Sequence, residues 1–264
     1  MSGLDEPHAD FSAFASRIQE SIRVQACRWR DCVRIGPFVA SFSCDDDNPY
    51  LNYAIPNDAA TPSPADVDAL VAAYRERHRT PRLEYIPQLA PAVEPALVAR
   101  GFEVELRTPL MTCAGASSVR ALALEGIELL APRTEDEYRG AAAVQWEAYS
   151  EEGDVPERAV AALRRTVAAG GVVVLARDAA TGEPAGAGAC TSPHDGLTEL
   201  TSVGVREPFR RRGVAAAMAG WLARGAFAKG VSGVFLMAHG AAEARIYARA
   251  GFAERAEVLH ISLP

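Results

Sequence analysis

A short segment with three arginines and a glycine lies between a strand pattern and a helix pattern in the second half of the chain. The strand pattern ends at Val205, and an alanine-rich helix pattern follows Gly213. A loop of this kind at a helix N-terminus gathers backbone N–H groups that bind anions such as phosphate. The segment therefore predicts a site for a phosphate-bearing ligand. Its residues are Arg210, Arg211, Arg212, Gly213, Val214 and Ala215.

Composition and charge exclude several classes of function. The chain has 264 residues, of which 49% are hydrophobic and 23% charged, and its formal net charge is −7. These values are typical of a globular protein long enough for two domains, and the negative charge argues against nucleic-acid binding. No apolar run reaches the roughly 20 residues of a membrane helix, and the acidic start does not resemble a secretion signal. We therefore expect a cytoplasmic protein without nucleic-acid or membrane partners.

The five cysteines show no metal-binding or disulfide pattern. They are scattered along the chain without CxxC or Cys/His spacing. An odd, scattered set of this kind is typical of reduced thiols in the cytoplasm. The sequence therefore predicts neither a metal site nor a disulfide. The residues are Cys27, Cys32, Cys44, Cys113 and Cys190.

Strand and helix patterns alternate along the chain and divide it into two halves. Each half predicts an α/β fold in which a mixed, twisted sheet is flanked by helices. We expect a helical or loosely ordered leader over 1–20, a first domain over 21–113, a small-residue linker over 114–126, and a second domain over 127–264.

Local signals mark several element ends. Ser63 before Pro64 predicts a helix N-cap, and Thr134 followed by Glu137 predicts a capping box. Residues 34–42 and 50–55 are each predicted to form one strand.

The two halves repeat the same order of elements. The pairs Gly101-Phe102 and Gly251-Phe252, 150 positions apart, each follow a short helix pattern and precede a final strand. With this offset, residues 53–55 fall on 203–205 and helix falls on helix. Identities are few, so the repeated order is the main support for a diverged tandem duplication.

The second half resembles the GNAT superfamily of acyl-CoA N-acyltransferases. The family motif Arg/Gln-x-x-Gly-x-Gly/Ala is matched by residues 210–215, upstream of a Tyr-x-x-x-Gly-Phe ending that starts at Tyr247. The resemblance implies acetyl-CoA as the acetyl-donor substrate, no metal, and a pyrophosphate held by the loop. It also implies a β-bulge in the preceding strand, which diverges from the next one. Pantetheine would then pair with the backbone of Val203, Gly204 and Val205, so the missing side chain of Gly204 is expected to matter little.

The resemblance also implies two proton-transfer roles. Tyr247 would protonate the departing thiolate, and Glu199, at the start of the strand, would accept the proton of the amine. A packed tyrosine and a solvated carboxylate are the alternative interpretations. Further candidate bases are His194, Asp195 and His239.

We expect the acceptor to be a small-molecule amine, attracted by Glu151 and Glu152, unless these carboxylates are simply solvated. A protein N-terminus or a lysine is the alternative acceptor, and a non-catalytic acyl-CoA sensor is the alternative class of protein. Proteins of this kind are often dimeric, so a homodimer is also expected.

Two departures from the family pattern concern cofactor contacts. The segment 239–242 (HGAA) lacks the asparagine that often contacts pantetheine in the family. In the first half, residues 60–65 (ATPSPA) match the arginine loop in position, but they contain no glycine and two prolines. Proline lacks the N–H donor that would hold a pyrophosphate. We therefore expect a degenerate GNAT-like repeat in the first half that does not bind coenzyme A.

Overall fold

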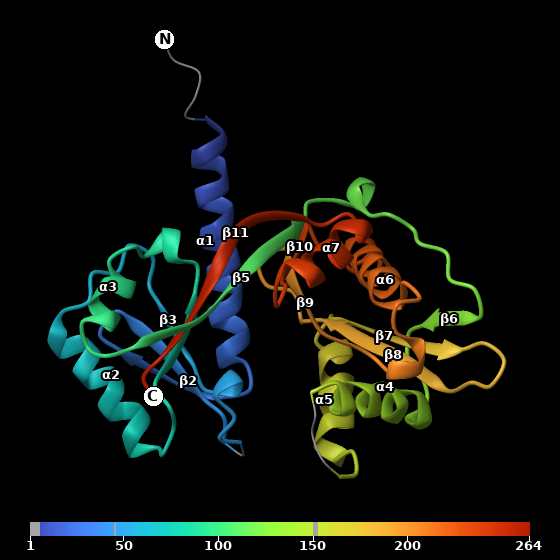
Figure 1. Ribbon diagram of the computed structural model, residues 1–264, viewed down its shortest axis with the longest axis horizontal. Helices are drawn as coiled ribbons and strands as arrows, with labels where there is room; N and C mark the ends of the chain where they lie inside the picture. The colour runs from blue at the N-terminus through green and yellow to red at the C-terminus, as the bar shows by residue number, and fades with distance from the viewer. Residues whose placement is uncertain (1–5, 45, 150–152) are drawn as a thin grey trace. The chain divides into compact units, whose positions relative to one another are not determined.

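Two compact units make up the protein, for which the computed structural model describes residues 6–44, 46–149 and 153–264 (Figure 1). The first unit comprises residues up to Pro109 together with Ala256–Pro264, and the second comprises Leu110–Arg255. The expected domains 21–113 and 127–264 were each continuous in sequence, whereas the final strand from Ala256 onward belongs to the first unit. No helix in the described part of the chain is both long and apolar enough to cross a membrane.

The second unit is a mixed sheet with helices on both faces. Its strand β9 pairs with β8 in the antiparallel sense and with β10 in the parallel sense, and β10 also pairs with the end of β5. The strands are the end of β5 (Glu103–Cys113) from Leu110 onward, β6 (Ile127–Leu130), β7 (Val172–Asp178), β8 (Pro184–Cys190), β9 (Leu197–Val205) and β10 (Gly233–Met237). The helices are α4 (Glu135–Ala148), α5 (Glu157–Ala168), α6 (Val214–Ala228) and α7 (Ala241–Ala250).

Strand β7 shows why both faces of this sheet are covered. Side chains of a strand point alternately to opposite faces, and every residue of its VVVLA run is buried. Val172 and Val174 belong to the core formed with α6 and α7, whereas Val173 and Leu175 belong to the core formed with α4 and α5. The two helix layers lie on opposite sides of β7 and β8 (Figure 1).

The first unit repeats part of this arrangement. Its strands β3 and β4 are parallel neighbours joined through α2, as β9 and β10 are joined through α6. Its elements are α1 (Glu6–Cys27), β1 (Asp31–Ile35), β2 (Phe38–Phe42), β3 (Ala54–Pro56), α2 (Pro64–Glu76), β4 (Arg82–Tyr85), α3 (Val93–Val98) and the end of β11 (Ala253–Ser262). The repeated order agrees with a tandem duplication.

The last strand of each half pairs with a strand of the other half. Strand β11 pairs with β4 over residues 259–262, and the end of β5 pairs with β10 over residues 110–113. A strand pattern does not reveal which edge the strand will join. The sequence therefore located both strands but not this exchange.

The expected leader is part of a core. Helix α1 continues to Cys27, and its Ile18 and Gln19 are fully buried. The expected linker is also packed: Val119 and Leu124 contact the core under α6, and the N–H of Arg120 donates to the carbonyl of Ala250 at 3.0 Å.

The prediction that all cysteines are reduced is wrong for two of them. Cys27, at the end of α1, forms a disulfide with Cys32 in β1. The helix ends and the chain turns into β1 within five residues, which brings the two Cα atoms to 5.5 Å. This spacing matches no standard motif, so the sequence carried no signal for it. Cys44, Cys113 and Cys190 are free thiols.

The two strands expected over 34–42 and 50–55 are interrupted. Gly36, with φ of 51°, turns the first one into a hairpin of β1 and β2. In the second, Pro49–Leu51 forms a 3₁₀ turn, and the strand occupies only Ala54–Pro56.

Candidate acyl-CoA site

Strand β9 contains the expected bulge. Between the pairs Ala189↔Thr201 and Ala187↔Gly204, β9 has one residue more than β8. Ser202 lies in this interval with φ of 56°, a left-handed conformation that is strained for a residue with a Cβ. The bulge therefore bends β9 just before the segment 203–205.

Beyond the bulge, β9 diverges from β10. Their described parallel pairing runs from Gly233↔Leu197 to Phe235↔Glu199 and does not continue toward Val205. Leu236 and Met237 of β10 still pair with β5 on the other side. One edge of β9 is thus available to an extended ligand that pairs with backbone groups.

The arginine loop leads into an uncapped helix. Gly213 is the N-cap of α6 with φ of 84° and provides no side-chain capping bond. The first described hydrogen bond of the helix runs from the N–H of Ala217 to the carbonyl of Gly213. The earlier N–H groups of α6 have no intrahelical acceptor, which makes this helix start suitable for an anion.

The three arginines of the loop have different surroundings. Arg210 donates its Nε–H to the carbonyl of Val205 at 3.0 Å. Arg212 donates to the carbonyl of Glu125 at 3.3 Å, and its guanidinium lies over the ring of Phe209. Arg211 is exposed and has φ of 62°. All three place positive charge around the helix start.

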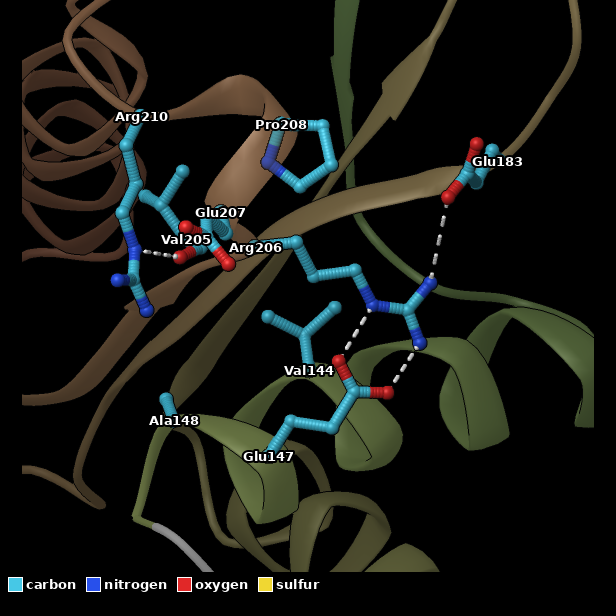
Figure 2. Close-up of a pocket in the computed structure, with 9 residues that line it drawn as sticks. All are labelled: Val144, Glu147, Ala148, Glu183, Val205, Arg206, Glu207, Pro208 and Arg210. Atoms are coloured by element: carbon cyan, nitrogen blue, oxygen red, sulfur yellow. Dashed lines mark hydrogen bonds and ion pairs between the residues drawn. The ribbon is translucent and has the colours of Figure 1, made fainter.

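A cavity of about 410 Å³ lies between α4, the end of β9 and the start of this loop (Figure 2). Val144 and Ala148 line it from α4, and Val205 lines it from β9. Arg206 is held at its edge by two hydrogen bonds to Glu147, at 2.6 and 2.8 Å.

Tyr247 is buried on α7. Only 9% of it is exposed, and its ring packs edge-on against Phe252. Burial raises the pKa of Tyr247, and the nearby Glu243 and Tyr149 raise it further. Among the described residues, none forms a hydrogen bond with its hydroxyl, so this proton is available to a ligand.

Glu199 lies at the last β9–β10 pair, where the strands begin to separate. Its side chain is half-buried. Desolvation raises the pKa of both Tyr149 and Cys190, and the charge of Glu199 adds to the increase. Glu151 and Glu152, the carboxylates expected to attract the acceptor amine, lie outside the described residues. The described residues contain no group of three or more His, Cys, Asp or Glu side chains that could hold a metal ion.

Tyr149 also lies near Tyr247 and Glu199, although no motif in the sequence indicated a role for it. It is the C-cap of α4, it is 61% exposed, and it interacts with the side chain of Ser202. Desolvation by the surrounding protein raises the pKa of Tyr149, the interaction with Ser202 opposes this, and the charges of Glu243 and Glu199 add to the increase. Only its position four residues after Gln145, on the same helix face, could have suggested a shared role.

Packing against α4 requires glycine at position 204, a role that the sequence did not indicate. A Cβ built on it would lie 2.6 Å from the Cβ of Ala148 and 3.3 Å from the carbonyl oxygen of Val144. Strand β9 therefore approaches the backbone of α4 more closely than any side chain at this position would allow.

We expect Gly204→Ala to lower the free energy of unfolding by about 1–3 kcal/mol, because the added methyl overpacks the contact with α4. Chemical denaturation measures this change. Ala148→Gly in the same chain should restore part of the loss. Gly115→Ala is the matched control, since Gly115 has extended backbone and no atom lies within 4 Å of the place its new methyl would take. Unchanged stability of Gly204→Ala would contradict the close approach.

In the first unit, the matching helix start is already capped. Ser63 caps α2, and the Asp66 carboxylate accepts a hydrogen bond from the backbone N–H of Ser63 at 2.8 Å. These bonds lower the pKa of Asp66, which stays charged at neutral pH. A negative charge at this position disfavours a phosphate.

The matching strand ends also have partners within the chain. Gln19 of α1 accepts a hydrogen bond from the N–H of Ile86, just beyond β4, at 2.8 Å. Arg23 donates to the carbonyl of Pro56, at the end of β3, at 2.9 Å. Helix α1 thus binds backbone groups at the ends of both β3 and β4.

Comparison with known proteins agrees with this geometry. The Acetyltransferase (GNAT) family profile matches residues 137–252. A GCN5-related N-acetyltransferase from Kribbella flavida is 25% identical, with 95% of each chain covered and a TM-score of 0.78. One from Sphaerobacter thermophilus is 17% identical, with 86% of this chain and 81% of that one covered and a TM-score of 0.63. No curated protein sequence matches significantly.

A tandem GNAT protein from the clavulanic acid biosynthesis pathway shares the fold as well. It is 14% identical, with 85% of this chain and 77% of that one covered and a TM-score of 0.60. Together, the profile match and the folds identify residues 137–252 as a member of the GNAT superfamily, within a tandem GNAT-like architecture. The family uses acyl-CoA donors, and the open β9 edge with its uncapped helix start fits such a substrate.

Proposed function

We propose that the second unit transfers an acetyl group from acetyl-CoA to the primary amine of a small molecule. The observation that carries this proposal is the divergence of β9 from β10 beyond Glu199, beside the uncapped start of α6. An extended pantetheine arm would pair with the backbone of residues 203–205, as an added strand does. The pyrophosphate would accept hydrogen bonds from the N–H groups of residues 211–215, with the loop arginines neutralising its charge.

The chemistry assigned to the site is a direct transfer. The neutral amine attacks the thioester carbonyl carbon, and Glu199 takes the proton that the nitrogen loses. A backbone N–H of the bulged strand would stabilise the negative charge on the carbonyl oxygen. The carbon–sulfur bond then breaks, and Tyr247 gives its proton to the thiolate. The products are the N-acetyl amine and coenzyme A. Glu199 then releases its proton to solvent, and Tyr247 takes one up from solvent.

A steady-state assay tests this proposal. Release of free thiol from acetyl-CoA should depend on an added amine, across a panel of small primary amines, peptides with a free N-terminus and lysine peptides. Acceleration by a small amine supports the proposal, and acceleration only by peptides would indicate a protein acceptor. Binding of acetyl-CoA without transfer to any member would indicate a sensor.

We further propose that the protein acts in the cytoplasm, as a homodimer, without nucleic-acid or membrane partners.

A further inference from the structure

The last turn of α4 forms a hydrogen bond with Ser202, the strained residue of the bulge. Gln145 donates its Nε2–H to the carbonyl oxygen of Ser202 at 3.0 Å. Tyr149, the C-cap residue that follows this turn, interacts with the Ser202 side chain. Gln145 and Tyr149 are four residues apart, so both lie on the same side of the helix end. The carbonyl of Ser202 is thus bound to the last turn of α4, and its hydroxyl faces the same helix end.

The contact with Gly204 completes this arrangement. Ala148 lies between Gln145 and Tyr149 in sequence. Because Gly204 has no side chain, β9 can approach Ala148 closely. The bulge is therefore held by the hydrogen bond from Gln145 and by close packing at Gly204. Such support is needed because Ser202, with φ of 56°, would not adopt this conformation readily by itself.

The direction of one peptide follows from the Gln145 bond. In a planar trans peptide, the carbonyl and the following N–H point in opposite directions. The carbonyl of Ser202 points to Gln145 on α4, so the N–H of Val203 points away from α4. Val203 lies in the register gap of the bulge, where β9 has no directly opposed residue in β8.

We propose that Gln145 is a positioning residue that fixes the Ser202–Val203 peptide, so that the Val203 N–H donates to the thioester carbonyl oxygen. Tyr149 adds a second contact, with the Ser202 side chain. This inference rests on the proposed acetyl transfer. It adds a requirement that the transfer alone does not contain: a side chain on α4, outside the binding loop and the proton-transfer pair, controls the rate.

Gln145→Met tests the inference, because methionine keeps the length of the side chain and removes the donor. We expect kcat to fall about 10- to 100-fold, less than the full loss of an oxyanion donor, with KM for acetyl-CoA changed less than about twofold. Ser202→Gly in the same chain should recover part of kcat, since glycine adopts positive φ without strain. Gln88→Met, at an exposed position of the first unit, is the matched control and should change nothing.

Two further measurements separate this inference from the proposed function. Amide hydrogen exchange of Val203 and Gly204, measured without ligand, should accelerate in Gln145→Met. The carbonyl carbon resonance of bound [1-¹³C]acetyl-CoA should move in the variant toward its value in free acetyl-CoA. If the wild-type protein neither binds nor turns over acetyl-CoA, the proposed function fails, and exchange still tests the support of the bulge. If Gln145→Met kept the wild-type kcat and the wild-type exchange rates of Val203 and Gly204, the inference would be overturned. Equal losses of kcat, acetyl-CoA affinity and melting temperature, without rescue by Ser202→Gly, would also overturn it.

Discussion

Replacing Tyr247 with phenylalanine is expected to lower kcat for acetyl transfer by about 10²- to 10⁴-fold, the range typical of a lost general acid. The Tyr247 hydroxyl has no hydrogen-bond partner among the described residues, so its proton is available, and burial raises its pKa. The affinity for acetyl-CoA should stay nearly unchanged, because phenylalanine keeps the ring that packs against Phe252. Steady-state kinetics and calorimetry measure the two effects separately.

The pH dependence gives an independent check of this role. The pKa of a free tyrosine is about 10, and that of Tyr247 is raised, so its acid form persists through neutral and mildly alkaline pH. The kcat of the wild-type protein should therefore show no loss due to this group between pH 7 and 10. Tyr138→Phe, at an equally buried tyrosine of α4, is the matched control. A large loss of acetyl-CoA affinity in Tyr247→Phe would assign the residue a binding role instead.

Gly213→Asp should weaken acetyl-CoA binding by about tenfold to several hundredfold, from the repulsion between a carboxylate and a nearby phosphate. Aspartate and asparagine both tolerate the left-handed conformation of Gly213 and both cap helices well. Gly213→Asn is therefore the matched control, with nearly the same shape and no charge.

The difference between the two variants isolates the electrostatic effect. Both should fold with similar melting temperatures, and raising the ionic strength should narrow the gap in Kd between them. Equal affinities in the two variants would show that the phosphates bind elsewhere.

The sequence predicted features that depend on neighbouring residues. The caps at Ser63 and Thr134 form as expected, each with its reciprocal acidic partner at the third helical position. Gly251 ends α7, as the Gly-Phe pair after the short helix pattern indicated. The bulge and the strand divergence were also anticipated, through the family resemblance.

Features that depend on distant partners were missed. The contacts of Gln145 and Tyr149 with Ser202 connect α4 to a strand more than 50 positions later, and no local pattern encodes them. The same reason applies to α1, whose Gln19 and Arg23 bind strand ends far along the chain. It also applies to β11, because its alternation shows a strand without naming its neighbour. The need for glycine at position 204 arises from its close contact with α4, which the sequence does not show.

Calorimetric titration of the full chain with acetyl-CoA tests the central claim most directly. The open edge of β9 and the uncapped start of α6 occur in the second unit, whereas the matching groups of the first unit are bound by Ser63, Gln19 and Arg23. We therefore predict saturable binding of one acetyl-CoA per chain, weakened in Gly213→Asp and retained in Gly213→Asn. The absence of binding, or two equivalent sites per chain, would contradict the account.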